Sequence, residues 1–181
     1  ILKKLAGNAT TDYEYAIALS DFYERTNQLD KSQKISNDLI KSVSKSGFQT
    51  IELYNSLLRK GKVEWALKTL QATRKELKNQ YPLHLQFAEV YSLLGKTDEM
   101  IDELMEVLDN YPGSATEIQA SLSQQIDFQE DATGAYVKLK GKLLTRIQKK
   151  PNDVVYADML IWLFVQKKEF KSALVQAQAL D

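Results

Sequence analysis

The sequence predicts an all-α fold built from helical hairpins. Along most of the 181-residue chain, apolar residues recur at the three- and four-residue spacing of amphipathic helices. Only three prolines and seven glycines are present, which favours long regular elements over turn-rich β structure. Residues typical of turns recur with a nearly constant period. Asn27, Gly61, Gly95, Gly134 and Lys168 are separated by 34, 34, 39 and 34 residues, as in stacked arrays of helical hairpins.

The first predicted hairpin is preceded by residues 1–10, which are expected to hold the end of an earlier helix that closes at Gly7. Because the chain starts with Ile1 and not with Met, we expect it to be a fragment of a longer protein. A capping box, with Thr11 as N-cap and Glu14 at the third helical position, predicts the start of the hairpin.

The next two hairpins end at prolines. Their internal turns are expected at Gly61 and Gly95, and their second helices end before Pro82 and Pro112. A proline after a helix cannot continue its hydrogen bonding, so these ends are well defined in the sequence.

The fourth hairpin is the irregular one. A capping box from Ser114 to Glu117 predicts a longer and more polar helix, which runs through Phe128 and absorbs the five extra residues before Gly134. The predicted single domain covers residues 12–181. Its repeats are expected at about 12–46, 47–80, 81–113, 114–152 and 153–181.

The pattern within each period resembles the tetratricopeptide repeat (TPR) family. That family has Leu, a small residue and an aromatic in the first helix, Gly at the turn, Ala in the second helix and Pro at the end. The resemblance is carried by Ala16, Leu19, Ser20, Tyr23 and Leu39; by Leu53, Leu57, Gly61, Ala66 and Leu70; by Phe87, Ala88, Tyr91, Gly95, Leu104 and Pro112; and by Ala157, Leu160, Phe164, Phe170, Ala173 and Ala177. The fourth repeat departs from it, with Leu139 in place of the small residue. The resemblance implies a right-handed α-α superhelix of antiparallel helix pairs.

The resemblance also implies a binding face, because the first helices of such an array line a concave groove. The family's clamp for a peptide carboxylate is not expected, because only Asn55 matches its residues. The groove is expected to be apolar with an acidic row, which suits a segment carrying basic and apolar residues. Two alternatives remain open. In the first, the acidic residues of the row are solvated surface residues that bind no partner. In the second, Trp162 packs against a further hairpin of the array. The candidate groove residues are Asp21, Asn55, Leu58, Glu89, Asp158 and Trp162.

The charges balance overall but are uneven along the chain. The 24 basic and 24 acidic residues give a formal net charge of zero, so no global field favours nucleic acid. Residues 97–137 contain acids and no Lys or Arg, whereas residues 138–150 contain only bases. A nucleic-acid-binding helix is the less favoured interpretation of the basic segment. The period predicts instead that the second helices of adjacent repeats lie side by side with complementary charges.

No group of residues indicates catalysis or a cofactor site. The chain has no cysteine and one histidine, His84, and we expect it not to be an enzyme. No apolar run approaches the ~18 residues that span a membrane, so no membrane insertion is expected. The predicted function is a scaffold that binds a protein or peptide segment. The alternative is a structural spacer or oligomerisation segment of a larger protein, for example an exported bacterial one, since such arrays are widespread in bacteria.

Overall fold

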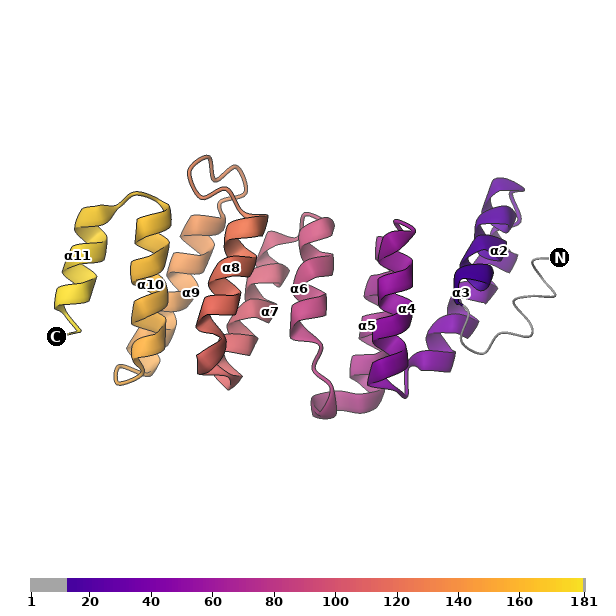
Figure 1. Cartoon of the computed structure of the whole chain (residues 1–181), viewed down its shortest axis with the longest axis horizontal. Helices are drawn as coiled ribbons and strands as arrows, with labels where there is room; N and C mark the ends of the chain where they lie inside the picture. Colours follow the sequence, from indigo (N-terminus) through magenta and orange to yellow (C-terminus); the bar gives the residue numbers. More distant parts are fainter. Residues whose placement is uncertain (1–12, 181) are drawn as a thin grey trace. The chain divides into compact units, whose positions relative to one another are not determined.

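The computed structural model describes residues 13–180, apart from the side chain of Asn79. Within these residues the chain forms ten α-helices and two short 3₁₀ helices with no strand (Figure 1), so the all-α fold predicted from the sequence is confirmed. The helix expected at residues 1–10 and the capping box that begins at Thr11 start outside the described residues.

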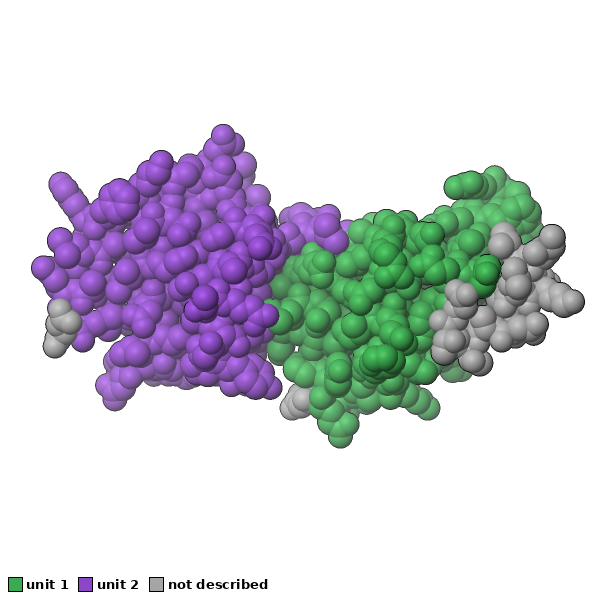
Figure 2. Space-filling model, in the orientation of Figure 1, with its two compact units in different colours: residues 1–90 green, residues 91–181 purple. Residues whose placement is uncertain are grey.

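The chain divides into two compact units, residues 1–90 and residues 91–181 (Figure 2). The boundary lies within helix α6 (His84–Leu93). Both units consist of helices that pair as antiparallel neighbours through short turns (Figure 1).

Unit 1 contains two complete hairpins. Its elements before α6 are α2 (Tyr13–Arg25), α3 (Leu29–Val43), α4 (Gly47–Arg59), α5 (Val63–Leu77) and the 3₁₀ helix η1 (Lys78–Gln80). Helix α2 pairs with α3 and α4 pairs with α5, while α2 also packs on α4 and α3 on α5. The first helix of one hairpin therefore packs on the first helix of the next, and the second on the second. Leu53, Leu57 and Leu70 are fully buried between them.

Small polar side chains complete the interior of unit 1. The hydroxyl oxygens of Ser20 and Ser32 lie 2.7 Å apart, and those of Thr50 and Thr73 also lie 2.7 Å apart. All four residues are buried, so these pairs satisfy hydroxyls that would otherwise be unfavourable inside the protein.

Unit 2 is also built from helices that pack on their neighbours along the chain and on the next helix but one. After the end of α6 its elements are α7 (Thr97–Asn110), the 3₁₀ helix η2 (Pro112–Ser114), α8 (Ala115–Gln125), α9 (Ala135–Lys149), α10 (Val154–Gln166) and α11 (Phe170–Gln178). Helix α7 packs on α9, α8 packs on α10, and α10 also packs on both α9 and α11. The core contains Ile101, Leu104, Ile118, Leu143 and Leu160, none of which exposes more than 1% of its surface.

The turn period predicted from the sequence is present in the backbone. Asn27, Gly61, Gly95, Gly134 and Lys168 all adopt positive φ angles, between 55° and 69°. At four of them, all but Gly134, the turn residue donates its N–H to the carbonyl three residues earlier, and the next residue donates to the carbonyl five residues before itself. This pair of bonds is the Schellman motif, which ends a helix at a left-handed residue.

The fourth hairpin differs from the prediction, because α8 ends at Gln125 and residues 126–134 form a loop. The expected helix through Phe128 is therefore wrong. The Oδ1 atom of Asp127 accepts the N–H groups of Gln129 and Glu130, at 2.8 and 3.3 Å, and so provides the chain with a turn in place of a further helical turn. The five extra residues lie in this loop.

The capping box expected at Ser114 is also wrong. Ser114 does precede α8, but its side chain makes no capping hydrogen bond. It belongs to the 3₁₀ turn that begins at Pro112, and its φ and ψ of −83° and 5° are not the extended geometry that a capping side chain needs. Capping hydrogen bonds are made instead by Ser46, before α4, and by Asp153, before α10.

Candidate binding surface

In unit 1 the predicted groove residue Asp21 is paired with a lysine of the next hairpin. The Nζ atom of Lys62, the residue before α5, lies 2.7 Å from Oδ1 of Asp21 and 2.8 Å from Oε2 of Glu24. Burial lowers the pKa of Lys62, but its hydrogen bonds to the two carboxylates outweigh this effect and hold the pKa above its ordinary value. Asp21 thus joins two hairpins in addition to facing solvent.

The remaining candidates of unit 1 lie on α4 and α6. Asn55 is exposed and Leu58 is half-buried. Glu89 is exposed and accepts a hydrogen bond from the hydroxyl of Tyr54, whose ring is buried. Burial and this carboxylate both raise the pKa of Tyr54, so the hydroxyl stays protonated and acts as the donor.

In unit 2 the candidates Asp158 and Trp162 lie on one face of α10. They are four residues apart, and Gln166 follows at the same interval, so the three side chains share a stripe of the helix. Asp158 is exposed and Trp162 is half-buried. The indole of Trp162 packs edge to face against the ring of Phe128, with centroids 5.7 Å apart and planes at 88°.

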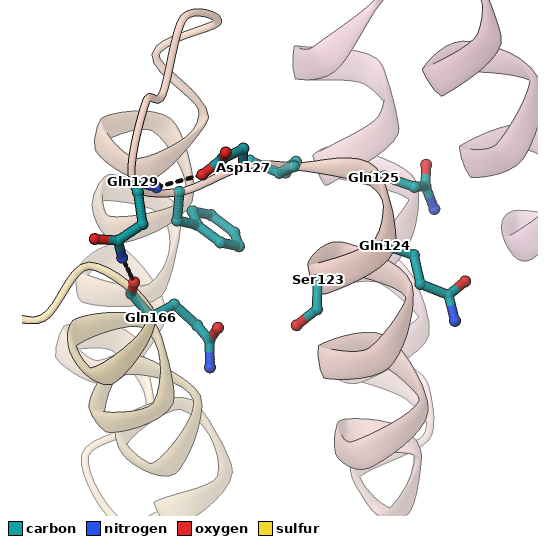
Figure 3. A pocket seen from close by; sticks show the side chains of 8 residues that line it. Ser123, Gln124, Gln125, Asp127, Gln129 and Gln166 are labelled. Atoms are coloured by element: carbon teal, nitrogen blue, oxygen red, sulfur yellow. Dashed lines mark hydrogen bonds between the residues drawn. The ribbon is translucent and has the colours of Figure 1, made fainter.

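The loop 126–134 is fastened to the end of α10 around this aromatic pair. Phe128 exposes only 4% of its surface. The ammonium group of Lys167 donates to the carbonyls of Phe128 and Gln129, at 2.7 and 3.2 Å, and the side-chain amide of Gln129 donates to the carbonyl of Gln166 (Figure 3). The loop is therefore held by a buried ring and by hydrogen bonds to its main chain.

A polar pocket of ≈ 410 Å³ lies between α8, this loop and the end of α10. Its wall includes Ser123 and Gln124 from α8, Gln129 from the loop and Gln166 from α10, which Figure 3 shows from nearby. Amide and hydroxyl groups dominate, and each amide can both donate and accept hydrogen bonds. We call this space the amide pocket.

A second, smaller pocket of ≈ 200 Å³ lies between the α6–α7 turn and the other side of the same loop. We call it the loop pocket. Its lining residues are Ser92, Gly95, Thr97, Met100, Gln125, Ile126, Asp127, Glu130, Ala132 and Thr133. Gln125, Ile126 and Asp127 line both pockets, so the start of the loop forms the wall between them.

The complementary charges predicted for the second helices of unit 2 are confirmed. The acids of α7 pair with the bases of α9 along the contact between the two helices. The ion pairs are Lys138 with Asp98 at 3.3 Å, Lys142 with Asp102 at 2.5 Å and Arg146 with Asp109 at 2.7 Å. Three bases of the basic segment, Lys138, Lys142 and Arg146, therefore form ion pairs with α7.

Asp109 is at the centre of the most connected part of this contact. It accepts hydrogen bonds from the guanidinium of Arg146 and, at 2.8 Å, from the hydroxyl of Tyr156. Burial opposes ionisation of Asp109, but these donors outweigh it and hold the pKa of the carboxyl below its ordinary value. The cluster joins α7, α9 and α10 and has a structural role.

The two pockets were missed in the sequence, because both depend on the loop 126–134. The signal that was available is local: Asp127 and the segment from Asp131 to Gly134 are typical of turns. The apolar residues Ile126 and Phe128 continue the helical spacing of α8 and so favoured a helix.

Neither a metal site nor a membrane span is found in residues 13–180. No group of three or more His, Asp or Glu side chains is placed there to hold a metal ion. None of the helices in this range combines the length and the apolar character needed to cross a bilayer. Comparison of the chain with models of known protein families, with curated proteins and with solved structures found no match.

Proposed function

We propose that this chain is a protein-interaction scaffold of the tetratricopeptide type, which binds a peptide or protein segment along the first helices of its hairpins. The observation that supports it most is the surface beside α8 and α10. There Trp162, the amide pocket and the loop pocket lie around one anchored loop. Tryptophan is enriched among the residues that contribute most to binding energy at protein interfaces.

The chemistry of this surface favours binding over catalysis. Its polar groups are amides, hydroxyls and carboxylates, and the histidine of the chain, His84, does not line either pocket. Such groups recognise a main chain and charged side chains by hydrogen bonding. In unit 1 we propose the exposed Asn55 on α4 and Glu89 on α6 as contacts of that unit with the partner.

Site-specific photo-crosslinking tests the proposal. A photoreactive phenylalanine analogue replaces the exposed Asp158 on α10 or Asn55 on α4, and the control position is the exposed Val137 on α9, a second helix. We expect crosslinked partners from the first two positions and none from the control. The captured partner is then purified and titrated against the Asp158→Lys variant, for which we expect an affinity at least about tenfold lower.

Two results contradict the proposal. The first is equal capture at Val137 and at Asp158, which indicates non-specific contact. The second is an unchanged affinity of the purified partner for Asp158→Lys, together with unchanged affinity for Trp162→Ala. Either result favours the alternative, in which the helical array is a spacer.

A further inference from the structure

We infer that the loop pocket binds the side chain of a lysine or arginine carried by the partner segment. This inference rests on the proposed function, because it assigns the chemistry of one contact on the same surface. It follows from the acceptors that line the pocket, from an unpaired buried oxygen, and from the size of the space.

The polar side chains of the pocket all offer oxygen acceptors. Asp127 and Glu130 contribute carboxylates, while the remaining polar side chains are hydroxyls and the amide of Gln125. No Lys, Arg or His lines the pocket, and neither carboxylate forms an ion pair with another residue of the described chain. The nearby ammonium group of Lys96 lies over the ring of Tyr91, 6.0 Å from its centroid. Within residues 13–180, therefore, no ion pair neutralises the charge of these two carboxylates.

The amide of Gln125 supplies a second, independent observation. Its Nε2 atom donates to the hydroxyl of Ser121 at 2.7 Å, which orients the amide. Its Oε1 atom is buried and has no hydrogen-bond partner among the described residues. A buried acceptor without a donor is unfavourable. The Gln125 side chain is half-buried, so a turn of its amide toward the pocket would let this oxygen accept an N–H group of a ligand.

The size and the apolar part of the pocket match one long basic side chain. A volume of ≈ 200 Å³ is below the ~300–1,000 Å³ of pockets that enclose drug-sized ligands. Met100, Ile126 and Ala132 provide an apolar wall next to the acceptors. A lysine or arginine places its methylene stem on such a wall and its charged end among oxygens.

The neighbouring amide pocket indicates that the cation is part of a polypeptide. The two pockets share Gln125, Ile126 and Asp127, so a segment that crosses the start of the loop reaches both. In the amide pocket, the side chains of Gln129 and Gln166 can pair with main-chain N–H and carbonyl groups. A free amine uses only the first pocket and gains nothing from the second.

Titration of ¹⁵N-labelled protein with blocked pentapeptides, followed by NMR, tests the inference. The probes have Lys, Arg, Gln or Glu between flanking alanines, and butylamine serves as the free cation. We expect the Lys and Arg peptides to shift the amide signals of Gly95, Thr97, Ala132 and Thr133. The Gln and Glu peptides should bind with an affinity at least about tenfold lower. The double variant Asp127→Asn/Glu130→Gln is expected to lose this preference. Asn retains an oxygen that accepts the loop N–H groups.

The control variant is Glu117→Gln, which removes an exposed carboxylate from the first turn of α8 and should leave the titration unchanged. The inference is overturned if the Lys and Gln peptides cause equal shifts in the wild-type protein. This test does not depend on the variants being stable. Equal affinity for butylamine and the Lys peptide also overturns it. If Asp158 crosslinks a partner but the Lys preference is absent, the pocket inference fails while the scaffold function stands.

Discussion

Two substitutions at the repeated turns of unit 2 are expected to change the free energy of unfolding in opposite directions. Gly95 and Lys168 occupy the same place in the same Schellman turn, with φ angles of 67° and 61°. Residues with a Cβ atom are strained in this left-handed region, whereas glycine is not. Gly95→Ala should therefore destabilise the protein, and Lys168→Gly should stabilise it.

The magnitude follows from the backbone alone. A Cβ atom added at Gly95 meets nothing within 4 Å, so no packing clash contributes to the change. The left-handed conformation costs an L-residue roughly 1–2 kcal/mol, and the smaller freedom of alanine in the unfolded chain offsets about 0.4–1 kcal/mol. The net loss for Gly95→Ala is about 1 kcal/mol. The same reasoning gives a gain of about 0.5–1 kcal/mol for Lys168→Gly.

Urea unfolding followed by circular dichroism measures both changes. The matched control is Gly141→Ala, because Gly141 lies in the interior of α9 at an ordinary helical φ, and a Cβ added there also meets nothing within 4 Å. Alanine is about 1 kcal/mol better than glycine at such a helical position, so this control should stabilise unit 2. The equivalence of the turns is refuted if Gly95→Ala matches the gain of Gly141→Ala, or if Lys168→Gly is destabilising.

Two further predictions concern the loop and the charged cluster of unit 2. Phe128→Ala should cost about 3 kcal/mol and shift the fluorescence of Trp162 to longer wavelength, because it removes a buried ring from the indole; an unchanged spectrum contradicts the packing described here. Asp109→Asn should lower the free energy of unfolding at neutral pH by about 1–3 kcal/mol, because it removes a charge held by Arg146 and Tyr156. The pKa of Asp109 is below its ordinary value in the folded protein, so its contribution is present above the unfolded pKa and is lost as pH falls through the folded pKa. The difference between the wild type and Asp109→Asn should therefore shrink below about pH 4, and a difference that grows on acidification rejects this assignment.

Local features of the sequence account for much of the fold. A left-handed turn residue between two amphipathic stretches specifies a Schellman turn without information from the rest of the chain, as at Asn27, Gly61, Gly95 and Lys168. Gly134 is also left-handed, as its place in the period suggests, but it follows a longer loop. The contact of α7 with α9 also follows from the sequence. Once the period places second helices side by side, acids such as Asp102 and bases such as Lys142 have to face each other.

The side chains that pair with the candidate groove residues within the protein could not be predicted in the same way. Asp21 and Glu89 have the spacing of a solvent-facing acidic row, yet one meets Lys62 and the other meets the hydroxyl of Tyr54. Both partners lie more than 30 residues away along the chain. The helical spacing predicts which face of the helix a side chain lies on, but not which distant side chain it contacts there. Asp158 and Trp162 remain predictions for the groove that the crosslinking experiment tests.

The sequence by itself determined the all-α fold, the five turns and the charge complementarity of unit 2, because each depends on spacing along the chain. The tertiary structure decided the fate of residues 126–134. Ile126 and Phe128 continue the helical spacing of α8, and a helix was the better local solution. Phe128 is buried against Trp162 instead, and Lys167 binds the loop carbonyls, so contacts with α10 outweigh local preference. The same contacts form the two pockets on which the proposed binding depends.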